Sequence, residues 1–455
     1  MEQKTNSSLA VSLSGGGHRA TLFTLGALMY LVDAGLNTQV TSIASVSGGS
    51  LTNAFAGQNL DFRSTDSAGF RKEAAIPLAS QIANKGTFLA PLSTKVYIAI
   101  LLLTGVLVFV PFFTDWMWLV RLAFFLGMLF VFGVVFARRG RVCARAFERT
   151  LFSKNGRATR LRDIARPNID HVLCATELRS AEAVFFSGTF VYSYCLGHGI
   201  PSDLNLARAV QASACFPGGF PPARIKGAQH SFTGAPNIPG CDAAQKRELV
   251  MSDGGVYDNM GDEWARAFTG RVKRWPELGL GRVPPDRLVV VNASARFPWV
   301  PFSYGAIPIA GEILALKTVL DVMYLNTTNV RRQEIVHSFT PDKPADPATL
   351  PSVLVQIAQS PFVVAEAFAK SKDPAGQRAR AVLNTLGNTK DEWAKIAQAN
   401  ATVGTKLSRF KRDVTVRLIY HGYVVSMCNL HTLFGDDFPL RPQMLDINQF
   451  SELVQ

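Results

Sequence analysis

Two long apolar stretches lie close together inside this chain of 455 residues, and they restrict its fold more than any other feature. They span Tyr97–Phe113 and Trp116–Phe136, separated by the short turn Thr114-Asp115. Each has roughly 17–21 residues, about the length of a helix that crosses a hydrocarbon core of ~30 Å. The sequence therefore predicts a transmembrane helical hairpin, with helices at about 97–113 and 116–136.

Two other arrangements remain open for these stretches. They could be buried core helices of a large globular domain, or a hairpin that enters one leaflet only, because the first stretch is short and has Pro111 near its end. The near absence of charge favours the membrane. Arg121 is the one charged residue inside the second stretch, and it lies close enough to the start for its side chain to reach the interface.

Positive charge is concentrated beside the apolar stretches. Lys+Arg number 47 and Asp+Glu 34, which gives a net charge of +13 and suits an anionic partner. The turn between the stretches has no Lys or Arg, so the positive-inside rule places both ends of the hairpin in the cytoplasm. We expect this basic flank to contact anionic lipid headgroups, and we expect no nucleic acid. The flanking residues are Arg71, Lys72, Lys85 and Lys95 before the hairpin, and Arg138, Arg139, Arg141, Arg145, Arg149, Lys154, Arg157, Arg160 and Arg162 after it.

The rest of the composition predicts a multi-pass membrane protein whose folded part is cytoplasmic. Residues 1–13 hold only a short apolar run before the glycines begin, so we expect no signal peptide. The cysteines form no CxxC pair, which favours free thiols over a disulfide framework or a zinc site. We therefore expect no metal and no cofactor. The cysteines are Cys143, Cys174, Cys195, Cys215, Cys241 and Cys428.

Outside the hairpin, strand, loop and helix patterns alternate, which is typical of a parallel sheet covered by helices. The pattern stops near Gln58 and resumes near Leu161. The predicted strands are Leu9–Leu13, Thr41–Val46, His171–Thr176, Ala183–Phe190, Leu249–Ser252, Arg287–Asn292 and Val416–Tyr420. The predicted helices are His18–Ala34, one that begins near Ser50, Leu204–Ala214 and the amphipathic surface helix Glu312–Leu325.

The segment Ser45-Val46-Ser47-Gly48-Gly49 follows a predicted strand and opens a helix. A catalytic serine needs such a sharp turn with small neighbours, so that its hydroxyl is exposed. The usual pattern is Gly-x-Ser-x-Gly, and Ser45 here replaces the first glycine. Asp253-Gly254-Gly255 also ends a predicted strand, although an Asp before two glycines is by itself often only a turn.

A glycine-rich loop, Ser14 to Gly17, lies between the first strand and the first helix. Its backbone N–H groups could receive negative charge, as the oxyanion of an ester hydrolase requires. Gly15-x-Gly17-x-x-Ala20 also matches the dinucleotide fingerprint. That fingerprint needs an acidic residue at the end of the next strand, where this chain has Ser45–Ser47. We therefore favour the oxyanion interpretation.

Together these motifs resemble the patatin-like phospholipase family. The resemblance also covers Val256-Tyr257-Asp258-Asn259 and Ala209–Pro222, which is similar to the family's helix and Pro-rich turn. Order and spacing fit apart from the segment inserted between Gln58 and Leu161. The departures are Ser45 and Ala20, each in place of a glycine, and the match is less distinct beyond about Val330.

The resemblance implies a three-layer α/β/α fold with a mostly parallel central sheet, and a Ser–Asp dyad. Ser47 would be the nucleophile and Asp253 the base that accepts its proton. The N–H groups of Gly15, Gly16 and Gly17 would form the oxyanion hole, and Arg19 would support their loop. The remaining glycines expected to leave room around the two turns are Gly49, Gly254 and Gly255.

We therefore expect a membrane-anchored serine hydrolase that cleaves fatty acyl esters of phospholipids or lysophospholipids. A lipid acyltransferase on the same dyad, a non-catalytic membrane scaffold and a nucleotide-binding oxidoreductase are the alternatives; the missing carboxylate disfavours the last. The expected organisation is a catalytic domain formed by residues 1–57 and 161–330, an insertion at 58–160, and a C-terminal part, 331–455, packed on the catalytic domain.

Overall fold

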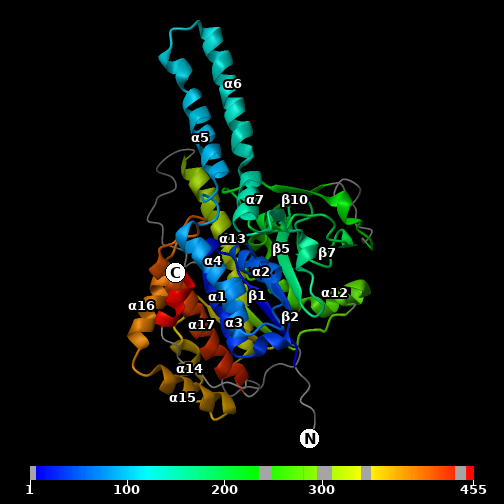
Figure 1. Ribbon diagram of the computed structural model, residues 1–455, viewed down its shortest axis with the longest axis vertical. Helices are drawn as coiled ribbons and strands as arrows, with labels where there is room; N and C mark the ends of the chain where they lie inside the picture. Colours follow the sequence, from blue (N-terminus) through cyan, green and yellow to red (C-terminus); the bar gives the residue numbers. More distant parts are fainter. Residues whose placement is uncertain are drawn as a thin grey trace.

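The computed structural model describes residues 7–234, 248–279, 281–294, 310–339, 350–435 and 447–454. A sheet runs through the body of the molecule, and helices surround it (Figure 1). Its parallel part has the strand order β12 (Ser352–Gln356), β11 (Arg287–Asn292), β1 (Leu9–Leu13), β2 (Val40–Ser45) and β5 (Asp170–Glu177). Antiparallel strands continue it as β6 (Glu182–Ser187), β7 (Val191–Ser193) and β8 (Gly197–Gly199). The predicted parallel α/β core is confirmed.

Helices on the two faces of the sheet belong to different parts of the chain. One group includes α1 (Gly17–Asp33), α2 (Gly48–Asn59), α4 (Ile76–Asn84), α8 (Leu206–Ser213), α14 (Phe362–Phe368), α15 (Pro374–Leu386), α16 (Lys390–Ala401) and α17 (Arg412–Phe434). The segment that follows the strand β10 (Glu248–Asp253) supplies α10 (Gly255–Asp258), α11 (Glu263–Arg266), α12 (Phe268–Arg274) and α13 (Ala310–Ser338). The predicted surface helix Glu312–Leu325 is part of α13.

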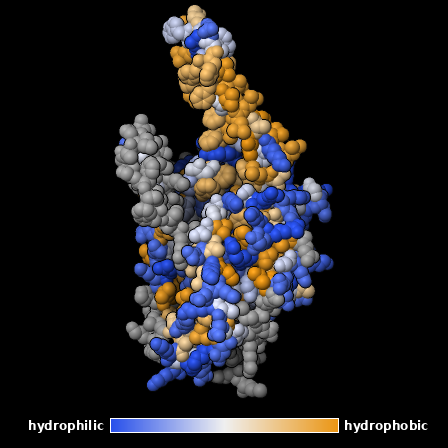
Figure 2. Space-filling view, turned by 90° about the vertical axis from the view of Figure 1, so that its left-hand side faces the viewer, coloured by the Kyte–Doolittle hydropathy of each residue, from blue (hydrophilic) through white to orange (hydrophobic). Residues whose placement is uncertain are grey.

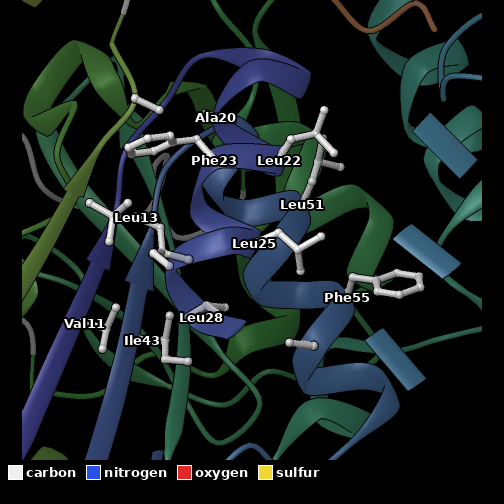
Figure 3. Close-up of a cluster of buried hydrophobic side chains, with 14 of the residues drawn as sticks. Val11, Leu13, Ala20, Leu22, Phe23, Leu25, Leu28, Ile43, Leu51 and Phe55 are labelled. Atoms are coloured by element: carbon white, nitrogen blue, oxygen red, sulfur yellow. The ribbon is translucent and has the colours of Figure 1, made fainter. Parts of the chain in front are cut away.

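Both faces of the parallel strands are buried, because successive side chains on a strand point to opposite faces. On β1, Val11 packs into the core beneath α1 and α2. Figure 3 shows Leu22 and Leu25 of α1 in this core, above the strands. The neighbouring Ala10 belongs to a second core, which contains Ala265 of α11. The sheet thus forms the middle layer between helices, as expected from the resemblance.

An apolar hairpin of two antiparallel helices projects from the body of the molecule (Figure 1). Its helices are α5 (Leu92–Leu107) and α6 (Trp118–Ala137), and the Tyr97 hydroxyl donates a hydrogen bond to the Val135 carbonyl oxygen at 3.0 Å. No residue of α6 is buried, and apolar side chains cover the projection (Figure 2). The alternative of two buried core helices is therefore excluded.

The first helix of the hairpin begins and ends earlier than predicted, at Leu92 and Leu107 in place of about 97 and 113. α5 ends at Leu107, and Val110–Phe113 forms a 3-10 turn that contains Pro111. Proline lacks an N–H and disfavours a helical residue before it, so the helix does not continue to Phe113. In the described part of the chain, the helical segment Trp118–Thr150 is the one long and apolar enough to cross a membrane, while α5 is a shorter apolar helix.

The apolar run Val416–Tyr420, predicted to be a strand, lies inside the helix α17. A short apolar run suits a buried strand and a buried helix equally well, so this prediction was wrong. α17 crosses α1 at two glycines. A Cβ atom at Gly26 would overlap the Ile419 carbonyl oxygen, and one at Gly422 would overlap that of Phe23. The close approach of the two helix backbones therefore requires these glycines.

Candidate active site

Two strands lie end to end along one edge of β5 and bring the predicted site together. β2 runs parallel to β5, and its last residue, Ser45, pairs with Leu173. β10 (Glu248–Asp253) approaches from the opposite direction, antiparallel to β5, and its last residue, Asp253, pairs with Ala175. Since β6 occupies the other edge of β5, the turns after β2 and β10 face each other.

The backbone of Ser47 has φ 51° and ψ −114°, outside the regions that a non-glycine residue ordinarily adopts. Its N–H donates to the carbonyl oxygen of Ser213 at 3.2 Å and lies 3.1 Å from the Ser213 hydroxyl oxygen. The Gly254 N–H donates to the same carbonyl oxygen at 3.2 Å. Ser213, at the end of α8, therefore joins the two turns. Sequence reasoning missed this role, although Ser213 lies inside the helix and turn that resemble the family.

The glycines around the two turns allow close backbone contacts. A Cβ atom at Gly48 would overlap the carbonyl oxygen of Gly17, and one at Gly254 would overlap that of Cys174. At Gly49 it would lie 2.6 Å from the Leu13 carbonyl oxygen. Contacts this short leave no room for a side chain, so the tight turn depends on glycine.

Ser45, which stands where the elbow usually has glycine, is held in a buried polar network. Its hydroxyl donates to the Val172 carbonyl oxygen at 3.0 Å. It accepts from the amide of Asn53 at 2.9 Å and from the hydroxyl of Ser50 at 3.1 Å. Because these partners satisfy the hydroxyl, the replacement of glycine here leaves no unpaired buried oxygen.

Asp253 is buried beside Ser47, with a side chain only 2 % exposed. Burial raises the pKa of its carboxyl group to about 7, because removal from water disfavours the charged form. Interactions with the Gly255 N–H, 2.8 Å away, and with the Ser47 hydroxyl oppose this rise. The predicted serine and aspartate are therefore brought together, and the carboxyl group can accept a proton near neutral pH.

The glycine-rich loop lies against the Ser47 turn. A Cβ atom at Gly15 would be 3.3 Å from the Cβ of Ser47 and 2.7 Å from the Asn259 side-chain oxygen. The Gly15 N–H donates to the Asn259 carbonyl oxygen at 3.2 Å, so it is not free for an oxyanion. Within the described residues, the N–H groups of Gly16 and Gly17 have no partner. The expected group of three donors is thus reduced to two.

Arg19 supports this loop from inside the protein. Its side chain is 1 % exposed, and its Nε donates to the Ala293 carbonyl oxygen at 2.9 Å. Its Nη1 donates to the Val403 carbonyl oxygen. Burial lowers the pKa of the guanidinium to about 10, so it stays charged at neutral pH. These bonds fix the first turn of α1 between the end of β11 and the C-terminal part of the chain.

The buried histidines of the described chain have hydrogen-bond partners away from the dyad. His18 bonds to the Thr87 hydroxyl and the Ser408 carbonyl oxygen. His171 bonds to Asn53, and burial lowers the pKa of its ring to about 3. His230 and His421 bond to the carbonyl oxygens of other loops. The hydrogen bonds of these four imidazoles thus involve neither Ser47 nor Asp253.

An apolar cavity with a volume of ≈ 330 Å³ opens beside the Asp253 turn. Ser252 and Val256 line it from either side of the Asp253 turn, and Met323 and Tyr324 of α13 also line it. Leu178 and four residues of the Pro-rich turn complete the wall; those of the turn are Pro217, Gly218, Phe220 and Pro222. A mostly apolar cavity, lined by residues on both sides of the Asp253 turn, can hold a hydrocarbon chain.

Five of the six cysteines lie in the described residues, and all five are buried. Cys143, Cys174, Cys215 and Cys428 are free thiols, Cys195 is buried as well, and Cys241 lies outside the described residues. In the ranges that the structure describes, no group of three or more His, Cys, Asp or Glu side chains is placed to hold a metal ion.

The fold and the site together define an α/β/α protein with a serine and a carboxyl group at adjoining strand ends. Residues 11–261, more than half of the chain, match the family described as patatin-like phospholipase. The chain therefore belongs to the patatin-like phospholipase family. A search of curated proteins found no match.

Two solved structures are similar to this chain at low sequence identity. Human GIVD cytosolic phospholipase A2 is similar over 100% of this chain and 64% of its own chain, with 13% identity and a TM-score of 0.50. This chain therefore spans less than two thirds of that protein. VipD from Legionella pneumophila matches 95% of this chain and 87% of its own, with 13% identity and a TM-score of 0.28.

Proposed function

We propose that this protein is a membrane-anchored serine hydrolase that cleaves fatty acyl esters of phospholipids or lysophospholipids. One observation carries the proposal: Ser47, in a strained turn after β2, contacts a buried Asp253 whose pKa is raised to about 7. A carboxyl group with an ordinary pKa near 4 is a weak base for a hydroxyl, and burial removes this disadvantage. Family membership supports the same activity.

In the proposed reaction, the Ser47 oxygen attacks the acyl carbonyl carbon while its proton passes to the Asp253 carboxylate. The N–H groups of Gly16 and Gly17 stabilise the negative charge on the carbonyl oxygen. Asp253 then returns the proton to the departing alcohol, which leaves as lysophospholipid or glycerophosphodiester. Water next attacks the acyl-Ser47 ester and loses a proton to Asp253. Asp253 returns this proton to the departing Ser47 oxygen as the fatty acid is released.

The hairpin would hold this site at the surface of the substrate. α6 has 20 residues, which at about 1.5 Å each span about 30 Å, the thickness of a hydrocarbon core. Its apolar side chains are exposed along its whole length, which is unfavourable in water and favourable in lipid. The arginines that follow α6 would lie at the headgroups on the cytoplasmic side.

On this proposal, residues 1–57 and 161–330 form a cytoplasmic catalytic domain. The segment 58–160 carries the membrane hairpin, and residues 331–455 pack on the catalytic domain, through contacts such as the pairing of β12 with β11. Gly49, Gly254 and Gly255 keep the two turns close enough for proton transfer between Ser47 and Asp253.

The test uses purified protein in detergent, a fluorophosphonate probe and phospholipid vesicles. We expect labelling at Ser47 and release of fatty acid, both lost in Ser47→Ala and in Asp253→Asn. Asp258→Asn is the matched control, because Asp258 is a second buried carboxyl group of the same motif. Its oxygens accept from the N–H groups of Met260 and Glu263, and it takes no part in the proposed dyad.

Three outcomes would contradict the proposal in different ways. A folded protein that neither labels nor releases fatty acid would be a scaffold. Equal losses in Asp253→Asn and Asp258→Asn would mean that the carboxyl groups act through folding alone. Transfer of the acyl group to added lysophospholipid or glycerol, faster than to water, would identify an acyltransferase on the same dyad.

A further inference from the structure

A second cavity, with a volume of ≈ 400 Å³, lies where the hairpin enters the body of the protein. Arg138 and Arg141 line it from the end of α6 and the start of α7 (Arg139–Thr150). Arg208 of α8 and Arg224 of β9 (Ala223–Lys226) line the other side. The rest of the wall is Ala137, Gly140, Pro221, Pro222, Ala223 and Val250, so the lining contains no carboxyl group.

These arginines have almost no neutralising partners among the described residues. Arg138 and Arg141 are exposed and form no ion pair there. Arg224 is paired with Glu248 at 3.7 Å, and both side chains are largely exposed, so the pairing is weak. Arg208 donates to the Gln211 side-chain oxygen and to the Arg224 carbonyl oxygen, and neither is charged.

The charges are also close enough to repel one another. Burial lowers the pKa of the Arg208 guanidinium, and the positive charge of Arg141 lowers it further. Three of these four guanidinium groups, all but that of Arg224, have no carboxylate partner among the described residues, and their mutual repulsion is unfavourable. An anion that accepts several N–H groups at once would relieve this repulsion, and phosphate oxygens match the planar guanidinium.

The position of the cavity relates it to the bilayer and to the dyad. Its wall begins at Ala137, the last residue of the apolar helix α6, and Figure 2 shows hydrophilic residues at the foot of the apolar projection. It also shares Pro222 with the apolar cavity beside Asp253. On β10, Val250 lines the arginine cavity and Asp253 ends the strand, about 10 Å away at ~3.3 Å per residue.

We propose that the cavity lined by Arg138, Arg141, Arg208 and Arg224 binds a phosphate group of the anionic lipid headgroup class, at the level where α6 leaves the membrane. This inference rests on the proposed function for its membrane placement. The arginine cavity would make the enzyme selective for anionic phospholipids. It would hold the lipid phosphate beside the proposed dyad while the acyl chain enters the apolar cavity.

The test measures binding, not turnover. Full-length Ser47→Ala protein in detergent is titrated with inorganic phosphate, with short-chain phosphatidylglycerol and with short-chain phosphatidylcholine. Binding is followed by calorimetry and by the shift in melting temperature. We expect phosphatidylglycerol to bind more tightly than phosphatidylcholine, and its Kd to rise about tenfold or more in Arg138→Gln/Arg141→Gln, which removes two charge-assisted contacts.

The matched control is Arg409→Gln/Arg412→Gln, which removes two exposed arginines that lie outside the basic flank and do not line the cavity. We expect less than a twofold change in Kd. Equal losses in the two double variants would overturn the proposal, because they would indicate general attraction to positive charge. Inorganic phosphate binding as tightly as the lipid would overturn the lipid headgroup as the ligand. Since Ser47 is absent, these results do not depend on whether the protein is a hydrolase.

Discussion

Ser45 and Asp253 end two strands that meet head to head along β5, where they pair with Leu173 and Ala175. Because one strand is parallel to β5 and the other antiparallel, both turns open into the same gap. Ser213 fixes the width of this gap, since its carbonyl oxygen accepts from the N–H groups of Ser47 and Gly254. The relative position of Ser47 and Asp253, the proposed dyad, is thus set by sheet pairing and by the end of one helix.

The raised pKa of Asp253 predicts the pH dependence of hydrolysis. The carboxylate accepts a proton only when ionised, so kcat/KM is expected to fall about tenfold per unit below pH ~7 and to level off above it. A pH profile with a soluble short-chain ester checks this. Asp258→Asn should keep the acidic limb, and a profile that stays flat down to pH 5 would contradict the role of Asp253.

Asp253 also makes the stability of the protein depend on pH, and here a rise in pH lowers stability, whereas it raises kcat/KM. Since burial raises the pKa of Asp253, its contribution to stability is complete below pH ~4 and is lost as the pH rises through about 7. We expect Asp253→Asn to be more stable than the unmodified protein at pH 8, on the order of 1–4 kcal/mol, with the difference shrinking toward pH 5. Thermal melting at both pH values measures it. If the stability gained by Asp253→Asn were smaller at pH 8 than at pH 5, the raised pKa of Asp253 would be contradicted.

The glycines at the two turns are expected to be intolerant of any side chain. In Gly48→Ala and Gly254→Ala the new methyl group would overlap a backbone carbonyl oxygen, which cannot move without disturbing the turns. We expect losses of about 1–3 kcal/mol in unfolding free energy and loss of fluorophosphonate labelling. Gly270→Ala, whose Cβ would contact nothing within 4 Å, is the control. Full labelling of both variants would show that the turns are less constrained than the structure indicates.

The hairpin proposal predicts which residues are accessible from each side of a membrane. Asp115 lies in the turn at the tip, and Arg149 lies on α7 at the foot. We expect Asp115→Cys to react with a membrane-impermeant maleimide from the non-cytoplasmic side only, and Arg149→Cys from the cytoplasmic side only. The described native cysteines are buried and give little background. Labelling of both variants from the cytoplasmic side would instead support a hairpin that enters one leaflet.

The crossing of α1 and α17 predicts a purely structural effect. Gly26→Ala would place a methyl group against the Ile419 carbonyl oxygen, so we expect a loss of about 1–3 kcal/mol. Denaturant unfolding in detergent measures this, with Gly270→Ala again as the control. The unfolding midpoint should fall, while the pKa seen in the pH profile should not change. An unchanged midpoint would mean that the helices can separate at little cost.

The sequence predicted the parts of this protein that depend on local pattern. β1, β2, β5, β10 and β11 follow from short apolar runs before glycine or polar turns, and they lie where expected. The positions of Ser47 and Asp253 follow from the same turns. The chemistry of the site could therefore be proposed before the fold was known. Only the pairing of β2 and β10 with β5 shows that these two residues lie close together.

Other features depend on distant contacts and could not be predicted locally. Val416–Tyr420 is helical because two glycines let α17 approach α1, and no pattern within five residues reports that approach. The Gly15 N–H cannot serve as an oxyanion donor because it donates to the carbonyl oxygen of Asn259, which lies 244 residues further along the chain. Ser213 acts through its carbonyl oxygen, which every residue type possesses.

The order of the elements along the chain has a consequence for biosynthesis. The ribosome makes the strand before Ser47 first, then α5 and α6, and only much later the strand that ends at Asp253. Under the proposed function, lipid-cleaving activity would therefore arise only after the hairpin has left the ribosome. A newly made chain would have its proposed membrane segment in place before its catalytic pair is complete.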